Sequence, residues 1–270
     1  MTRVLSGAFL LAVAVAVVWF APGWLFFAVA ELLLIVAFVE YAGLAAAAGF
    51  AIPRAAGLLT VIAASIGVSS TRWVDDAMAG TAILLDVAAM SGFLVLASMA
   101  LVSWRGERDA IGRVGAAVFP MLYLGLPIGA MVAIRAQHGP AALFLLMLTI
   151  VVSDTAQYYT GRAIGRRLLA PAISPKKTIE GAAGGFVFGA AFLTVAGRWW
   201  LAGAPALLRA TLGLAVVALG IGGDLFESML KRSAGVKDSA ALIPGHGGIL
   251  DRVDALLFAA PFYYIVLKYL

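Results

Sequence analysis

The run ALLRATLGLAVVALGIGGDL, residues 206–225, has the length and the apolar character of a helix that crosses a membrane. Such a helix needs about 20 mostly apolar residues, because the hydrocarbon core of a bilayer is about 30 Å thick. The rest of the chain has the same character: 63% of its 270 residues are hydrophobic and only 12% are charged. Soluble domains carry about 25% charged residues. The composition therefore predicts an all-α integral membrane protein.

About nine such runs follow one another along the chain. They cover residues 4–20, 24–50, 55–70, 77–102, 111–134, 141–159, 181–200, 206–225 and 249–270. Gly and Pro separate neighbouring runs, for example at Pro22-Gly23 and at Gly139-Pro140. We therefore expect a polytopic bundle of about nine transmembrane helices.

The first run, residues 4–20, admits two interpretations, because it follows Arg3 and has the apolar character of a secretory signal peptide. No clear cleavage pattern of small residues precedes Pro22, and a second apolar run follows at once. We expect a retained first span rather than a cleaved signal.

The positive charges of the short loops indicate how the bundle is oriented. About 14 of the 19 Lys and Arg residues fall on the side of the N-terminus, many of them in loops 162–177 and 231–252. Cytoplasmic loops carry this excess. We therefore expect a multi-pass protein of the inner membrane whose N-terminus and two large basic loops face the cytoplasm. The basic residues are too scattered to form a nucleic-acid surface.

Small residues recur at every fourth position of the run 181–200, at Gly181, Gly185 and Gly189. Such a stripe lets another helix approach closely. We expect it to serve helix packing inside the bundle, and a homodimer through membrane helices is the alternative use.

Ionisable residues near bilayer depth are costly, so clusters of them at the ends of spans are functional candidates. In the first cluster, Asp154 and Tyr158 are four residues apart and share a helix face. A hydrogen-bond network that merely ends the helix is the alternative explanation of this cluster.

The second cluster is the string SPKKT, in which Ser174, Lys176, Lys177 and Thr178 are candidate ligand contacts. Lysines, hydroxyls and the free amides of a following helix N-terminus suit an anionic phosphate. We expect Glu180 to complete the cap of that helix. A loop that only orients the bundle would explain the lysines, but not the whole string.

The third cluster is the densest and joins the last two runs. Asp224, Glu227 and Ser228 are spaced to share one helix face, and Asp251 and Asp254 share the first turn of the next helix. Four carboxylates on two helix ends offer the oxygen ligands that Mg²⁺ prefers. The chain has no Cys, which excludes thiolate metal sites and disulfides.

Cations and a histidine lie between these carboxylates, namely Lys231, Arg232, Lys237, His246 and Arg252. Lysine and arginine neutralise the charge of a polyphosphate. His246 lies beside glycines, where the backbone can approach a ligand closely. Salt bridges between two helix ends would explain one pair of charges, but not the whole set. Metal ligands and cations together are the components of phosphoryl-type transfer.

Residues 228–254 have the pattern S-x2-KR-x4-KD-x4-IP-x-HGG-x2-DR-x-D, which resembles the full motif of the phosphatidate cytidylyltransferases. The segments 154–162 and 174–178 are similar to that family as well. One departure is Gln157, where the family commonly has Ala, and we expect it to affect helix packing. The resemblance is specific from about residue 150 to the end, and before that it rests on hydropathy alone.

The resemblance implies an enzyme that joins CTP and phosphatidic acid to give CDP-diacylglycerol and pyrophosphate in phospholipid biosynthesis. It implies Mg²⁺, with or without a second cation. The phosphatidate oxygen would attack the α-phosphorus of CTP in line. Residues 141–270 would form the catalytic region, and residues 1–140 a transmembrane scaffold that can admit lipid.

The resemblance also implies a role for each candidate residue. Asp224 and Asp251 are the expected leading metal ligands, with Glu227 and Asp254 as supporting or alternate ligands. His246 is expected to contact substrate rather than act as a general base. The expected catalytic residues are Asp224, Asp251, Lys237, Arg252 and His246. The expected substrate contacts are Asp154, Tyr158, Ser174, Lys176, Lys177, Thr178, Ser228, Lys231 and Arg232.

Other functions remain as alternatives. A CTP-dependent polyprenol or phytol kinase would also be membrane-bound and metal-dependent, but it would release CDP instead of pyrophosphate. CDP-alcohol phosphotransferases are disfavoured, because their aspartate motif is absent. A secondary transporter would place its charges near the midplane on broken helices, whereas these charges gather at one membrane face.

Overall fold

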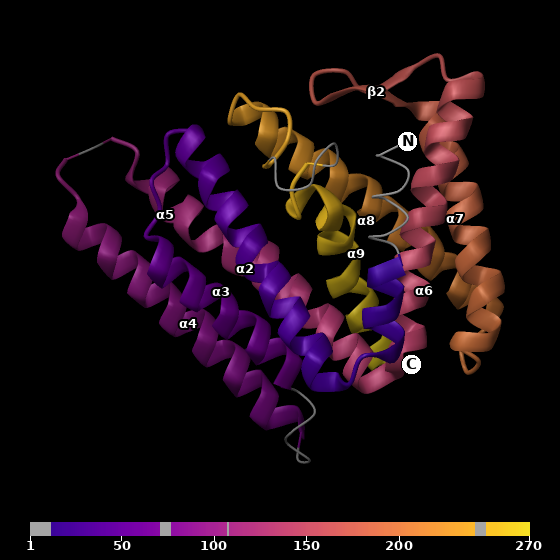
Figure 1. Cartoon of the computed structure of the whole chain (residues 1–270), viewed down its shortest axis with the longest axis horizontal. Helices are drawn as coiled ribbons and strands as arrows, with labels where there is room; N and C mark the ends of the chain where they lie inside the picture. Colours follow the sequence, from indigo (N-terminus) through magenta and orange to yellow (C-terminus); the bar gives the residue numbers. More distant parts are fainter. Residues whose placement is uncertain (1–11, 71–76, 107, 241–246) are drawn as a thin grey trace.

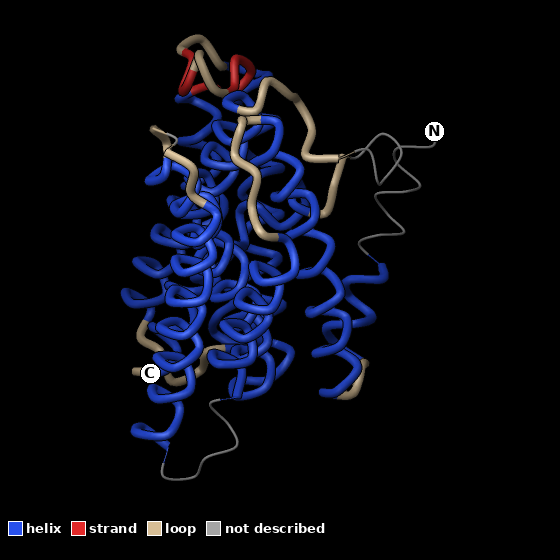
Figure 2. The backbone as a smooth tube through the Cα atoms, turned by 90° about the vertical axis from the view of Figure 1, so that its left-hand side faces the viewer, coloured by secondary structure: helices blue, strands red, loops and turns tan. Residues whose placement is uncertain are grey.

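The computed structural model describes residues 12–70, 77–106, 108–240 and 247–270. Most of this part of the chain is helical (Figure 2). After a helical segment at 12–20, the helices are α2 (Gly23–Ala47), α3 (Arg54–Ser69), α4 (Ala77–Ser103), α5 (Ala110–Pro120), α6 (Leu126–Ile164), α7 (Ile179–Trp200), α8 (Ala206–Ser233) and α9 (Leu250–Lys268), with the π-helical turn η2 (Met121–Gly125) between α5 and α6. Two short antiparallel strands, β1 (Leu168–Ala170) and β2 (Ser174–Thr178), form a hairpin between α6 and α7.

The helices form two groups that share one core. Helices α6, α7, α8 and α9 pack against one another, and α3 packs against α4, η2 and α6. Figure 1 shows α2 to α5 on one side of the molecule and α6 to α9 on the other. The shared core is aliphatic and aromatic, and it includes Phe38, Leu124, Leu146 and Tyr263, none more than 2% exposed.

Five helical segments of the described chain are long and apolar enough to cross a membrane. They are Gly23–Ala47, Leu85–Ser103, Ala110–Ile164, Ile179–Trp200 and Ala206–Ser233. The prediction of an all-α membrane bundle is therefore confirmed as a class. The number of nine spans and the orientation of the N-terminus stay predictions, because α3 is too short to be counted with these segments and residues 1–11 lie outside the described chain.

A kink takes the place of one predicted loop. The runs 111–134 and 141–159 belong to the helical stretch Ala110–Ile164, which consists of two helices that meet at a kink. Gly139 interrupts it with φ +83°, and Pro140 follows directly. Proline lacks an amide donor and clashes with the preceding turn, so a Gly-Pro pair bends a helix. The pair therefore separates the two runs by a bend.

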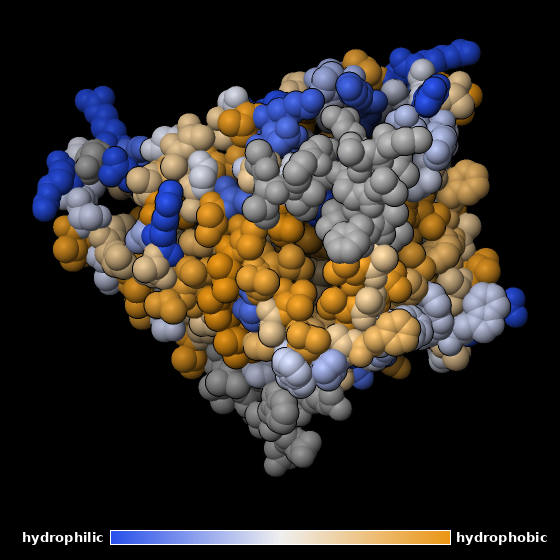
Figure 3. Space-filling view, viewed as in Figure 1, coloured by the Kyte–Doolittle hydropathy of each residue, from blue (hydrophilic) through white to orange (hydrophobic). Residues whose placement is uncertain are grey.

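The β-hairpin was not predicted, and it lies at the end of the bundle where α8 ends and α9 begins (Figures 1 and 2). Its second strand is the SPKKT string itself. Figure 3 shows hydrophilic side chains gathered over this end, above a broad apolar band. The predicted phosphate-binding string and the charged end of α8 therefore lie at the same end of the molecule.

The glycine stripe of α7 packs inside the bundle, as predicted. A Cβ built on Gly181 would come within 2.8 Å of the Gln157 carbonyl oxygen, and one on Gly185 within 2.6 Å of the Gln157 side chain. A Cβ on Gly189 would come within 2.6 Å of Val217. Glycine thus lets α7 lie against both α6 and α8.

A second close approach joins α3 to α6, and it can be tested. A Cβ built on Gly129 would come within 2.6 Å of the Ser65 carbonyl oxygen. Gly129→Ala is expected to destabilise the protein by about 1–3 kcal/mol, the usual cost of overpacking a core. The matched control is Gly43→Ala on α2, where a Cβ would meet nothing within 4 Å. Equal midpoints of thermal unfolding in detergent for the two variants would contradict the close approach.

Candidate functional site

An ion pair between Lys177 of β2 and Asp224 of α8 joins the hairpin to the bundle. One turn further along α8, the Ser228 hydroxyl donates to Asp224 Oδ1 at 3.5 Å, which confirms that these two residues share a helix face. After another turn, Arg232 donates to the Ile173 carbonyl oxygen of the hairpin at 3.4 Å. The structure therefore brings the second and third predicted clusters together.

A second pair of contacts centres on Lys231 and joins α8 to α9. The Lys231 ammonium forms ion pairs with Glu227, one turn earlier, and with Asp251, where Nζ and Oδ1 are 2.5 Å apart. The side chain of Glu227 is 0% exposed. Among the described residues its carboxylate has this ion pair and no hydrogen-bond partner. Since buried charges are screened little by salt, Lys231 holds the two helices together electrostatically.

The other oxygen of Asp251 is held by the chain that precedes α9. Its Oδ2 accepts hydrogen bonds from the Ser239 amide at 3.0 Å, the Ser239 hydroxyl at 2.8 Å and the Gly248 amide at 2.8 Å. Gly247 has φ +74°, and a Cβ there would come within 2.5 Å of this oxygen. The glycines of the motif thus let the backbone close around the Asp251 carboxylate, which fixes its orientation.

Asp154 and Asp254 complete the group of carboxylates. Each interacts electrostatically with Asp224, so carboxylates of α6, α8 and α9 face one another at this end of the bundle. Gln157 donates to Asp154 Oδ1 at 2.9 Å. The same amide side chain packs against Gly185 of α7. Gln157 therefore both packs the helices, as expected, and orients Asp154.

Several predicted residues lie at the rim of this group. Lys176, Lys237 and Arg252 are exposed. Tyr158 is 60% exposed, and its hydroxyl accepts a hydrogen bond from Arg162 at 3.3 Å. Their exposure leaves these side chains able to meet a ligand that arrives from the aqueous phase.

Residues at the start of α7 have structural partners. Thr178 is the N-cap, and its hydroxyl accepts a hydrogen bond from the Gly181 amide at 3.1 Å. Glu180 was predicted to complete this cap, but it accepts hydrogen bonds from the amides of Arg166 and Arg167 at 3.0 and 3.2 Å. It lies one position too early to reach back to the cap residue. Glu180 therefore holds the entry to the hairpin.

Ser174 opens β2 and is partly buried, beside the turn that contacts Arg232. His246 lies outside the described residues, so its predicted contact with substrate stays a prediction.

Three residues of the site were not predicted: Glu40, Ser239 and Tyr123. Glu40 of α2 accepts hydrogen bonds from the start of α9 and from Ser239. Tyr123 of η2 lies in the field of Glu227 and Asp251, and among the described residues its hydroxyl has no hydrogen-bond partner. A carboxylate within an apolar run is a signal that could have found Glu40. Ser239 and Tyr123 carry no comparable signal.

Lysines pair with Asp224, Glu227 and Asp251 in the structure. Within the described ranges, no group of three or more acidic or histidine side chains is arranged to hold a metal ion. The donor chemistry nevertheless fits Mg²⁺, because Asp224, Glu227, Asp251 and Asp254 offer oxygen ligands only. The buried Glu227 carboxylate also has unused hydrogen-bonding capacity. A cation at this site would replace positive charge that Lys177 and Lys231 now supply.

The chain matches the model of the cytidylyltransferase family over residues 1–270. It belongs to that family. It is 36% identical over 185 residues to the phosphatidate cytidylyltransferase of Bacillus subtilis, a match that covers 68% of each chain. The protein of the same name from Thermotoga maritima is 35% identical over 184 residues, which are 66% of this chain and 68% of that one. The Haemophilus influenzae protein of that name is 42% identical over 130 residues, 47% of this chain and 45% of that one.

Membership of the cytidylyltransferase family agrees with the resemblance found in residues 228–254. The structure adds how this segment is held: its lysine pairs with carboxylates of two helices, and its glycines enclose Asp251.

Removal of the Lys231 ammonium tests whether it joins α8 to α9. Lys231→Met leaves Glu227 buried without its ion-pair partner, which is expected to cost about 3–5 kcal/mol of stability. Lys237→Met, at an exposed position, is the control and should change stability by less than about 0.5 kcal/mol. Thermal unfolding in detergent measures both, and a Lys231→Met protein as stable as its control would contradict this role.

Proposed function

We propose that the chain is a phosphatidate cytidylyltransferase, which joins CTP and phosphatidic acid to give CDP-diacylglycerol and pyrophosphate. One observation carries the proposal. The same turns of α8 supply both an ion pair of carboxylate and lysine and part of the lining of an apolar cavity. Charged groups suit the triphosphate of a nucleotide, and an apolar cavity suits a lipid chain. The names of the relatives from Bacillus subtilis and Thermotoga maritima support the same reaction.

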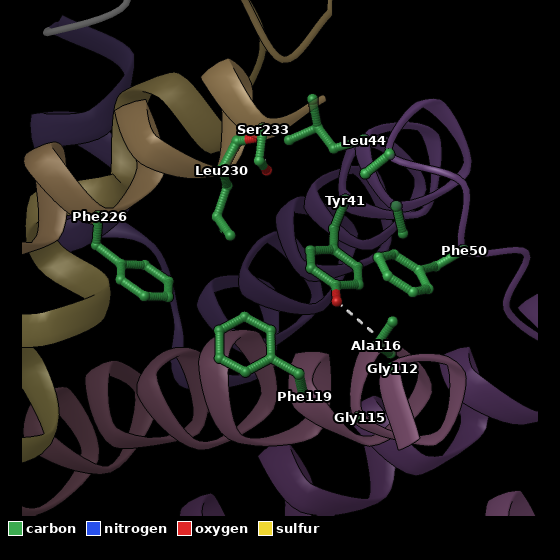
Figure 4. Close-up of a pocket in the computed structure, with 12 residues that line it drawn as sticks. Tyr41, Leu44, Phe50, Gly112, Gly115, Ala116, Phe119, Phe226, Leu230 and Ser233 are labelled. Atoms are coloured by element: carbon green, nitrogen blue, oxygen red, sulfur yellow. Dashed lines mark hydrogen bonds between the residues drawn. The ribbon is translucent and has the colours of Figure 1, made fainter. Parts of the chain in front are cut away.

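The apolar cavity has a volume of about 470 Å³ and lies between α2, α5 and α8 (Figure 4). Sites for small ligands commonly measure about 300–1,000 Å³. Figure 4 shows Tyr41, whose hydroxyl donates to the Ala116 carbonyl oxygen at 2.9 Å, and the rings of Phe50, Phe119 and Phe226 around the space. We propose that it holds part of an acyl chain of phosphatidic acid.

The cavity and the ion pairs are neighbours along one helix. Phe226 and Leu230 line the cavity, and each directly precedes a charged residue, Glu227 or Lys231. A lipid whose acyl chain lies in the cavity would thus have its phosphate near the charged groups. This arrangement would bring the two substrates together, which removes much of the entropic cost of a reaction between them.

The reaction needs positioning and charge neutralisation more than a protein base. An oxygen of the phosphatidate phosphate attacks the α-phosphorus of CTP and forms a new P–O bond to it. The bond between the α-phosphorus and the oxygen that bridges it to the β-phosphate breaks. Pyrophosphate leaves with the bonding electrons. The attacking phosphate is already charged, so no proton has to be removed from it. Lys177, Lys231 and the exposed Lys237 and Arg252 would hold phosphate oxygens during this step.

Mg²⁺ would be held by Asp224 and Asp251, with Glu227 and Asp254 as supporting or alternate ligands. When bound, it supplies neutralisation of charge on the triphosphate. Lys177 and Lys231, which pair with these carboxylates in the structure, would then be released to contact the phosphates of CTP. The same carboxylates would hold one Mg²⁺ ion, with or without a second cation.

We propose further that this end of the bundle faces the cytoplasm of the inner membrane, where CTP is available. The excess of Lys and Arg in the loops on this side supports the orientation. Contacts between the hairpin and α8 support a common side for both basic loops. A homodimer, if formed through membrane helices, would use a face other than the α7 glycine stripe, because that stripe packs against α6 and α8.

Product analysis with purified protein tests the proposed reaction. Labelled CTP, phosphatidic acid and Mg²⁺ should give a lipid that carries the cytidine label, together with pyrophosphate. Asp251→Asn should lower turnover by about 100-fold or more, because the site loses a carboxylate that would hold the Mg²⁺ ion. Asp86→Asn, at an exposed position of α4, is the matched control and should keep wild-type turnover.

Two results would contradict this assignment. Release of CDP with a phosphorylated alcohol, when polyprenol or phytol is supplied, would identify a CTP-dependent kinase. Wild-type turnover of Asp251→Asn would reject the role of this carboxylate.

Filling the cavity tests the proposed acyl-chain site. Gly115 lines the cavity, and a Cβ there would meet nothing within 4 Å, so Gly115→Phe adds a ring without a direct clash at Cβ. The KM for long-chain phosphatidic acid should rise several-fold, while the KM for CTP stays unchanged, because only lipid binding is obstructed. Gly43→Phe, outside the cavity, is the control. An unchanged KM for long-chain lipid in Gly115→Phe would exclude this cavity as the acyl site.

A further inference from the structure

Glu40 is a buried carboxylate of α2, 6% exposed, that reaches the beginning of α9. Its Oε1 accepts a hydrogen bond from the Ile249 amide at 2.8 Å, and its Oε2 accepts one from the Leu250 amide at 2.8 Å. Oε2 also accepts a hydrogen bond from the Ser239 hydroxyl at 2.9 Å. These partners are 199 to 210 positions away along the chain.

The contact supplies α9 with a cap from another helix. The first amides of a helix have no partner within it, and together they carry a partial positive charge. The residue at the N-cap of α9 is Ile249, whose side chain forms no capping hydrogen bond. Glu40 provides the missing acceptors and the matching negative charge. The backbone passes so close that a Cβ on Gly248 would overlap both Glu40 Oε2 and Ser239 Oγ.

Ser239 connects this cap to the candidate active site. Its hydroxyl lies between two carboxylates, 2.9 Å from Glu40 Oε2 and 2.8 Å from Asp251 Oδ2. The Ser239 amide and the Gly248 amide donate to the same Asp251 oxygen. Asp251 in turn pairs with Lys231. A movement of Glu40 would therefore shift the start of α9 and the donors that orient Asp251.

We propose that Glu40 is a positioning residue for cytidylyl transfer, and this inference rests on the proposed function. Glu40 holds the start of α9 and Ser239 in place, and these hold the Asp251 carboxylate in its orientation toward Lys231. It acts through Asp251 and does not touch substrate. Groups that orient a functional carboxylate typically contribute about 10–100-fold to activity or metal affinity.

The test compares two carboxylates of the same helix, Glu40, which is buried, and Glu31, which is partly buried. Glu40→Gln removes the charge and leaves one acceptor oxygen where there were two. Glu31→Gln is the matched control, because the Glu31 carboxylate accepts its hydrogen bond from Ser65 of α3, at 2.6 Å. Turnover and KM are measured for CTP and for phosphatidic acid, together with the Mg²⁺ concentration that gives half-maximal activity.

Glu40→Gln should lower kcat, or raise the Mg²⁺ requirement, by about 10–100-fold while the KM for phosphatidic acid stays within about twofold. Glu31→Gln should leave all of these values near wild type. Wild-type kcat and Mg²⁺ requirement in folded Glu40→Gln would overturn the inference. An equal loss in both variants would overturn it as well, because the effect would then be one of general stability.

Two further measurements keep the result decisive. If Glu40→Gln does not fold, Glu40→Asp takes its place. Aspartate keeps the charge but is one methylene too short to make all three contacts. Wild-type kcat and Mg²⁺ requirement in Glu40→Asp would reject the inference. Hydrogen exchange of the Ile249 and Leu250 amides should be faster in either Glu40 variant than in Glu31→Gln. If the wild-type protein makes no CDP-diacylglycerol, the proposed function is contradicted instead. In that case, unchanged hydrogen exchange of the Ile249 and Leu250 amides in the Glu40 variants would still reject the role of Glu40.

Discussion

One ammonium group, that of Lys231, allows two carboxylates of different helices to lie side by side in an apolar bundle. Without it, Glu227 and Asp251 would repel each other, and burial would oppose the charge of each. With it, α8 and α9 meet at their charged ends. The other contacts of the site meet this one at Asp251, since the preceding glycines and Ser239 orient the carboxylate that pairs with Lys231.

A cluster of aromatic rings packs next to the charged residues of the site. Phe119 stacks on Tyr123 at 5.1 Å, and Phe226 packs against Phe258 at 5.2 Å and against Tyr123 at 5.4 Å between ring centroids. These rings come from α5, η2, α8 and α9, so the cluster joins both groups of helices. The π-helical turn places Tyr123 in this cluster; such turns are frequent at functional sites. The helices of the charged site are therefore joined by packed rings as well as by ion pairs.

Much of the fold could be predicted because one physical rule, burial of long apolar runs in lipid, acts along the whole sequence. Helical spacing likewise placed Asp224 with Ser228 correctly. What escaped prediction depends on distant partners. The SPKKT string contains a proline and two lysines and has no strand-like alternation, so only its pairing with β1 reveals it as a strand. Glu40 shares its apolar run with one other charged residue, Glu31, and nothing local indicates that its partners are the amides of α9.

The contact between Glu40 and α9 also bears on how the protein is made. A ribosome synthesises α2 well before α9, with 210 positions between Glu40 and Leu250. Throughout that interval the carboxylate lacks the amides that later surround it, and a charge without partners is unstable in lipid. Glu40 of α2 can therefore gain these partners only after α9 has joined the bundle. The charged centre is thus completed only when the first and the final thirds of this sequence have come together.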